Sequence, residues 1–183
     1  MMAGKPSFNT LVEELTSRLR GACRIAVLGI GSPLRGDDAA GPQLARRLGR
    51  MKADGVMALD CASSPEGYTS RVKDFKADHV VLIDAVEAGL EPGEVVVLSG
   101  DQLSGLACNA HRLPLRLLAT YLKEELGAEV ILVGVQAKHV GLSLEEGLSK
   151  EVGEAVDRLK EVFEEVFRRL GRLKAGGARP RRG

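Results

Sequence analysis

Five short apolar segments recur along the chain, each about the length of a β-strand. They are RIAVLGI at 24–30, GVMALD at 55–60, HVVLID at 79–84, GEVVVL at 93–98 and EVILVGV at 129–135. Runs such as VVLI and ILVGV do not alternate with polar residues, so a strand built from them must be covered on both faces. The pattern therefore predicts about five strands in a sheet that is covered on both faces.

Helical patterns separate most of these segments. They cover residues 38–50, 66–76, 112–126 and 149–170, and in the last of them the apolar residues recur at a spacing of three and four. Strands that alternate with helices form a mostly parallel sheet with helices on both faces. The fold class is thus α/β, a three-layer α/β/α sandwich with a five-stranded sheet.

One strand breaks the parallel order. The segment at 93–98 follows the strand at 79–84 across the short link AGLEPG, which has no room for a crossover helix. We therefore predict that this strand is antiparallel and that the sheet is mixed.

The 183 residues suit one domain. Residues 1–23 carry Leu and Val at helical spacing and are predicted to form a helical extension, followed by a single domain at 24–170. Residues 171–183 are rich in Gly and Arg without periodicity, which is typical of a disordered tail. Because that tail is basic, the remainder carries 21 basic against 25 acidic residues, which disfavours nucleic acid as a partner.

Composition narrows the cellular setting. The start of the chain lacks the apolar core of a signal peptide, and no apolar run approaches the roughly 20 residues of a membrane span. The three widely spaced cysteines form neither a disulfide framework nor a CxxC metal motif. We expect a cytoplasmic monomer without a membrane partner.

Candidate chemistry lies just after the strands, because open α/β sheets place their sites at the carboxyl ends of parallel strands. The loop GIGSPLRGDDAAG at 29–41 delivers two carboxylates to a helix start, and we interpret Asp37 as an N-cap and Asp38 as a site residue. Asp84 ends a buried strand and His111 precedes a helix. Two carboxylates and one imidazole there would form an incomplete shell for a transition metal, with a plain hydrolytic cleft as the alternative.

Other residues give weaker signals. Dinucleotide binding through G-x-G-x-x-G would need glycine at Leu34, and the acidic pair repels phosphate. Cys61 could be a nucleophile with His111 as base and Asp84 as its orienting group, although a buried thiol is the preferred interpretation. His79 and His139 could both be surface groups, and His139 is of more interest because its loop follows a strand.

These motifs resemble the hydrogenase maturation proteases over residues 24–168. The resemblance rests on the loop at 29–41, LIDA at 82–85, His111 and VGVQ at 133–136. The segments DCASSPE at 60–66 and HRLPL at 111–115 are most similar to the branch that serves formate-hydrogenlyase and membrane-bound hydrogenases.

The resemblance implies an endopeptidase that removes the C-terminal extension of the large-subunit precursor of a nickel-iron hydrogenase after nickel insertion. It assigns metal contact to Asp38, Asp84 and His111, with the nickel carried by the precursor. Our hypothesis is that Asp38 is also catalytic and assists a water attack. A nickel-sensing chaperone that does not cleave is the rival from another functional class.

The chain departs from the family pattern in two places. Ser32 stands where asparagine is usual, and Cys61-Ala62 replaces a pair of glycines after Asp60. The second change lies in a loop that the resemblance links to precursor recognition, so it leaves the choice of hydrogenase open.

Overall fold

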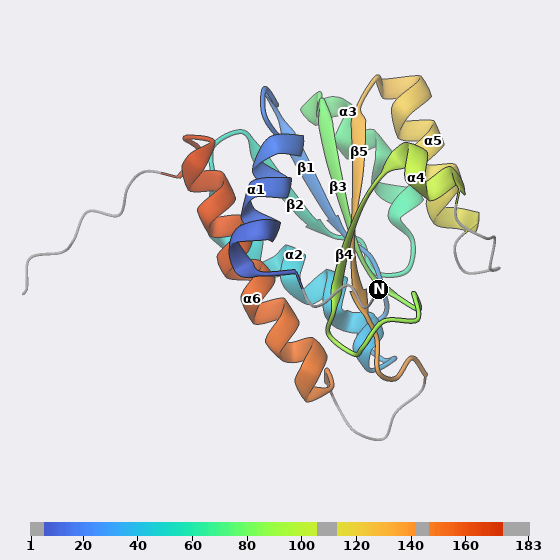
Figure 1. Ribbon diagram of the computed structural model, residues 1–183. Coiled ribbons are helices and arrows are strands. Elements are labelled where there is room, and N and C mark those ends of the chain that lie inside the picture. The colour runs from blue at the N-terminus through green and yellow to red at the C-terminus, as the bar shows by residue number, and fades with distance from the viewer. Residues whose placement is uncertain (1–5, 106–112, 142–146, 174–183) are drawn as a thin grey trace, which may run out of the picture.

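The computed structural model describes residues 6–105, 113–141 and 147–173 (Figure 1). Its centre is a five-stranded sheet with the order β2-β1-β3-β5-β4. The strands are β1 (Ile25–Gly29), β2 (Val56–Asp60), β3 (His79–Val86), β4 (Val95–Ser99) and β5 (Glu129–Gln136). All neighbours are parallel except β4, which runs antiparallel to β5. The predicted mixed sheet is confirmed.

All but one of the helices occur where the periodicity predicts them. They are α1 (Phe8–Arg18), α2 (Ala40–Arg50), α3 (Thr69–Phe75), α4 (Gly100–Gly105), α5 (Leu113–Leu126) and α6 (Lys150–Arg169), with short 3-10 turns η1 (Asp37–Ala39) before α2 and η2 (Pro65–Tyr68) before α3. Helix α4 was not predicted, because its sequence GDQLSG is short and has no apolar period.

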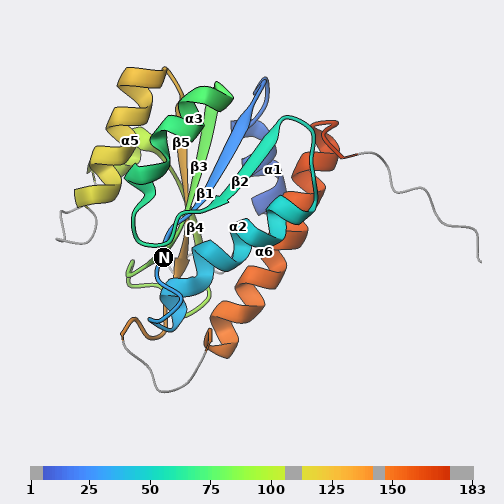
Figure 2. The same cartoon turned by 180° about the vertical axis from the view of Figure 1, so that it is seen from behind.

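The two faces of the sheet build two separate cores. Alternate strand residues such as Val27 and Val81 pack under α1, α2 and α6, whereas Leu28 and Leu82 pack on the opposite side under α3, α4 and α5. The helices cover both faces, as Figure 1 and the reverse view in Figure 2 show. The three-layer sandwich predicted from the sequence is thus the observed architecture.

Helix α1 belongs to this core. Ser7 accepts a hydrogen bond from the Thr10 amide at 3.1 Å and caps the helix, and Leu11, Val12 and Leu15 are buried. These apolar side chains join the cluster under α6. The predicted N-terminal extension is therefore helical, and from residue 8 onward it packs as part of the main domain.

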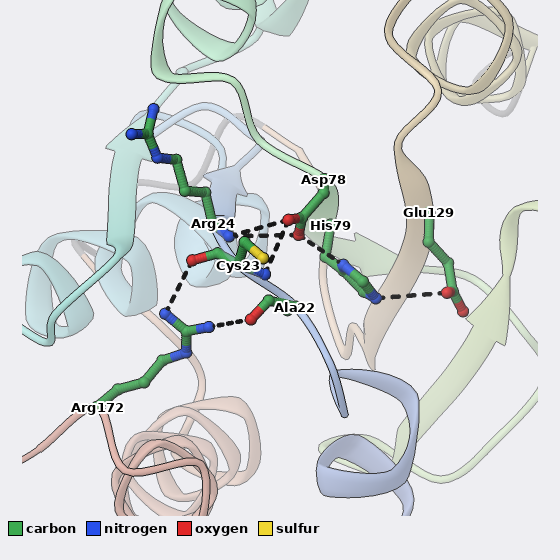
Figure 3. A network of polar contacts seen from close by, with 7 residues as sticks. All are labelled: Ala22, Cys23, Arg24, Asp78, His79, Glu129 and Arg172. Atoms are coloured by element: carbon green, nitrogen blue, oxygen red, sulfur yellow. Dashed lines mark hydrogen bonds and ion pairs between the residues drawn. The ribbon is translucent and has the colours of Figure 1, made fainter.

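At the other terminus, the ordered body passes the predicted boundary at residue 170. The Arg172 guanidinium donates to the Ala22 and Cys23 carbonyls (Figure 3). It also donates to the Asp54 carbonyl at 3.0 Å. These bonds tie the end of α6 to the segment that enters β1. The expectation of disorder was wrong for Arg172, while residues 174–183 lie outside the described part of the chain.

No helix in the described residues is long and apolar enough to cross a membrane.

Candidate active site

The glycine loop after β1 wraps around the Asp38 backbone. Gly31 has a φ of +131°, and a Cβ there would lie 1.8 Å from the Asp38 carbonyl oxygen. No other residue fits that approach. The turn aims the Ser32 amide at Asp38, whose Oδ2 accepts its hydrogen bond at 2.8 Å.

A second close approach brings Asp38 to the centre of the sheet. A Cβ on Gly41 in α2 would lie 2.3 Å from the Ile83 carbonyl and 2.4 Å from that of Ile30. Glycine thus lets the start of α2 pack directly on the ends of β1 and β3. Because Asp84 follows Ile83 in β3, the two carboxylates meet at this edge.

The pKa of Asp84 reflects the proximity of the two carboxylates. Burial first, and then the negative charge of Asp38, raise the pKa of Asp84 to about 7, against a smaller lowering by the Ala85 amide. Both carboxylates line the same cleft. Two carboxylates that repel each other in a partly buried site favour the binding of a cation or the sharing of a proton, because either one reduces the repulsion.

The cleft itself has a volume of about 960 Å³. Its polar wall comes from η2 and the segment around it, with Ser63, Glu66 and Thr69, and from Arg35 in the glycine loop. This size falls within the roughly 300–1,000 Å³ of typical ligand sites. Ser63 and Glu66 belong to the segment DCASSPE that carries the family resemblance, but the sequence did not show that they and Thr69 line the cleft.

Asp37 has a structural role that differs from the predicted one. Gly36 is the N-cap of η1, and no side chain caps that turn. The Asp37 carboxylate is buried and accepts hydrogen bonds from the amides of Lys138, His139 and Ser149 at 2.7–2.9 Å, and from the Ser149 hydroxyl. The N-cap interpretation was wrong, because the carboxylate satisfies a distant loop instead of its own helix.

The charge of Asp37 is well stabilised. Burial opposes its ionisation, but the hydrogen bonds from His139, Ser149 and Lys138 outweigh that cost and hold the pKa of Asp37 below its usual range. The Asp37 amide also donates to the His139 carbonyl at 3.2 Å, and Gly36 bridges to Val140. The glycine loop and the loop after β5 are thereby joined.

Gln136 fixes another wall of the cleft. Its Oε1 accepts hydrogen bonds from the Ala88 amide at 2.8 Å and the Leu90 amide at 3.2 Å, and its Nε2 donates to the Ala137 carbonyl at 2.9 Å. The side chain therefore holds the segment that leaves β3 beside Asp84. A polar residue at the end of the apolar run EVILVGV was the signal in the sequence, but its partners could not be inferred from it.

The histidines separate into different places. His111, the predicted third metal contact, lies outside the described residues, and among those residues no three His, Cys, Asp and Glu side chains form a metal-binding group. His139 is exposed on the loop that Asp37 holds. His79 is the first residue of β3, so it lies at the opposite end of the strands from Asp84. There its Nδ1 is 2.8 Å from Asp78 Oδ1.

Cys61 does not meet the requirements of a nucleophile. Its side chain is buried, with Sγ 3.7 Å from the Leu59 carbonyl. Burial, followed by the charge of Asp60, raises the pKa of the thiol to about 12 despite the opposing effect of Arg71. A thiol in that state stays protonated, so the cysteine-hydrolase alternative is not supported and the buried-thiol interpretation holds.

The glycine loop is also unsuited to a dinucleotide. A phosphate would use backbone amides such as that of Ser32, which already donates to Asp38. The acidic pair would repel the phosphate charge. The carboxyl ends of the strands instead place two carboxylates, Asp38 and Asp84, at an open cleft.

Comparison with known proteins identifies the family. The family model described as "HycI: Hydrogenase maturation protease" matches residues 42–166. The chain belongs to the hydrogenase maturation protease family. The HycI match also supports the branch predicted from the sequence, although the matched region begins after the glycine loop.

Individual relatives agree with this assignment. The hydrogenase 3 maturation protease of Escherichia coli K12 is 32% identical over 116 residues, which span 63% of this chain and 74% of that protein. The crystal structure of the [NiFe] hydrogenase maturation protease HycI from Thermococcus kodakarensis is 39% identical, with a TM-score of 0.77 over 85% of this chain and 99% of that one. The solution structure of the Escherichia coli endopeptidase HycI is 27% identical, with a TM-score of 0.65 over 75% and 87% of the two chains.

Proposed function

We propose that this maturation protease removes the C-terminal extension of a nickel-iron hydrogenase large-subunit precursor after nickel has been inserted. The nickel is bound to the precursor, and Asp38, Asp84 and His111 contact it. The enzyme acts in the cytoplasm as a monomer. Family membership supports the proteolytic activity, and the paired carboxylates in the cleft support recognition of a cation.

The observation that carries the proposal is that Asp38 and Asp84 line one cleft, where burial and the charge of Asp38 raise the pKa of Asp84 to about 7. An incoming cation would relieve both the burial cost and the mutual repulsion, so a precursor that holds nickel would bind more tightly than an empty one. Since the precursor's own cysteines supply the other ligands, a few protease ligands are enough. A precursor without nickel would leave the repulsion in place and would be rejected.

Asp38 is proposed as the catalytic group. Its Oδ2 accepts the Ser32 amide, and no donor among the described residues contacts its Oδ1. That oxygen would take a proton from water as the water attacks the scissile carbonyl carbon. The proton would then pass to the amine as the carbon–nitrogen bond breaks. The substrate's nickel holds the bond in place as a template.

The test uses purified protease with nickel-loaded and nickel-free precursor, followed by intact mass. We expect the loaded precursor alone to lose one C-terminal fragment, and Asp38→Asn to abolish that loss. A stable complex with unchanged mass would identify a nickel-sensing chaperone instead. Equal cleavage of the two precursors would overturn the role of nickel.

A further inference from the structure

The cleft continues beyond the acidic pair, and its character changes along the sheet. Asp38 and Asp84 lie over β1 and β3, while the neighbouring strands β5 and β4 contribute Leu132, Val96 and Leu98 to the same cleft. Helix α5 adds apolar residues from the side. The apolar arm is defined here as Val96, Leu98, Leu115, Leu117, Leu118, Tyr121 and Leu132.

This arm exposes apolar surface that the fold leaves uncovered. Among the described residues five large apolar side chains are exposed, and three of them line the cleft: Leu117 at 60%, Tyr121 at 44% and Val140 at 39%. Such grouping on a monomer marks a contact surface more often than chance scatter does. Leu117 and Tyr121 are four residues apart in α5, so they share one face of that helix.

The charges around the cleft restrict the kind of partner. Carboxylates at the sheet edge would attract a cation, whereas the charged residues elsewhere on the lining, among them Arg35, Glu66 and Glu87, are of both signs. A polyanion such as nucleic acid binds to a surface that is positively charged throughout, which this lining is not. A chain with a cation at one point and apolar side chains beside it matches both parts of the cleft.

We propose that the apolar arm binds apolar side chains of the precursor's C-terminal segment, in extended conformation, next to the bond that is cut. This inference rests on the proposed function and adds a specificity site to it. A scissile bond held at Asp38 places the flanking residues about 3.3 Å further along per residue, within the same continuous cleft. The arm would then select precursors by the side chains that flank the cut.

The experiment changes the exposed part of the arm, where folding is least at risk. Leu117→Lys and Tyr121→Ala are compared with Thr120→Lys, a control on the same helix whose exposed side chain does not line the cleft. Cleavage of nickel-loaded precursor is measured over a range of precursor concentrations. Size-exclusion chromatography with light scattering checks the oligomeric state of each variant.

We expect Leu117→Lys to raise KM about tenfold or more with kcat within about twofold, because the loss of apolar burial weakens binding of ground state and transition state alike. Tyr121→Ala should raise KM in the same way, and Thr120→Lys should match the wild type. A precursor with glutamate in place of an apolar residue beside the cut should recover cleavage by Leu117→Lys.

The outcomes separate this inference from the proposed function. If the wild type does not cleave loaded precursor, the proposed function fails. If the wild type cleaves and both arm variants keep its KM, the specificity site is wrong while the protease assignment stands. A change of oligomeric state in Leu117→Lys would also overturn the inference and assign this face to a second copy of the chain.

Discussion

The two ends of the central sheet use the same kinds of residue in opposite ways. At the amino end, the Asp78 carboxylate accepts hydrogen bonds from the Cys23 amide at 2.8 Å and the Arg24 amide at 3.2 Å, and contacts the His79 ring (Figure 3). His79 in turn lies 3.4 Å from Glu129. Hydrogen bonds therefore link the segment that enters β1 to the start of β3, and each ring nitrogen of His79 has an acidic partner.

At the carboxyl end the described residues satisfy the acids only in part. Among them Asp38 has one amide donor, and Asp84 is held beside Asp38 with its pKa raised to about 7. Such an arrangement costs stability and is kept where a ligand compensates for it. The difference indicates that an aspartate marks a site where its surroundings leave its negative charge uncompensated.

The same contrast occurs between two neighbours in the sequence. Asp37 is 1% exposed and accepts bonds from three amides and a hydroxyl, whereas Asp38 faces the cleft. One residue organises the loops and the other is available to substrate. Substitutions at the two ends, and at these neighbours, should therefore separate activity from stability.

The largest expected effect is on activity at Asp38. Asp38→Asn should lower kcat for precursor cleavage by about 100-fold or more, because a neutral amide cannot accept a proton from water. Thermal unfolding should change little. The matched control is Asp157→Asn. The Asp157 carboxylate on α6 pairs with Arg47 on α2, on the face of the sheet away from the cleft, so this variant should cleave normally. Normal cleavage by Asp38→Asn would remove it from the mechanism.

Asp37→Asn should show the reverse, with a loss of about 2–4 kcal/mol in the free energy of unfolding, since buried amides lose a charged acceptor. Because its folded pKa is lowered, the contribution of Asp37 is present above the ordinary pKa range of aspartate and is lost as the pH falls through the folded value. Urea unfolding at pH 7 and at pH 3 measures this. An equal deficit at both pH values would contradict the assignment.

Asp84→Asn should stabilise the protein at high pH. The folded pKa of Asp84 is raised to about 7, so wild-type stability falls as the pH rises from about 4 to 7, where only the unfolded state ionises freely. We expect a gain of about 1–3 kcal/mol at pH 8 and none at pH 4, with loss of precursor processing. Thermal unfolding across that pH range is the measurement, and a loss of stability at pH 8 would disprove the prediction.

The smallest effect is expected at the amino end of the sheet. Hydrogen bonds from His79, Cys23 and Arg24 outweigh burial and hold the pKa of Asp78 below its usual range, and the carboxylate is 39% exposed. Asp78→Asn should cost about 1 kcal/mol of stability and leave kcat and KM for the precursor unchanged. Altered cleavage kinetics in this variant would show that the two ends are coupled.

Much of the fold was predictable because its signals are local. Each strand is a continuous apolar run, and each long helix repeats its apolar residues every three or four positions, so both can be located without knowing their partners. The antiparallel strand β4 followed from the length of one link. The unpredicted α4 has no such signal within its six residues.

The site was predictable only in part. Strand ends in a parallel sheet share one edge, which was enough to select Asp38 and Asp84 before their meeting was observed. The role of Asp37 was misassigned because a first-turn acid suits a local cap, whereas its actual partners lie 101–112 residues away. The positions of Glu66 and Tyr121 in the cleft lining could not be inferred from the sequence, since a wall of a cleft is a property of packing.

The sequence by itself therefore determined the layers, the strand types and the two acids at the carboxyl edge, since each depends on local periodicity or on a rule of chain connection. Only the tertiary structure decided which acid has its hydrogen bonds satisfied and how far the pKa of Asp84 rises. It also decided that Arg172 donates to the carbonyl of Ala22, 150 residues earlier in the chain. These features depend on which groups are brought close and which are removed from water. Such distances arise only when the separate elements pack together.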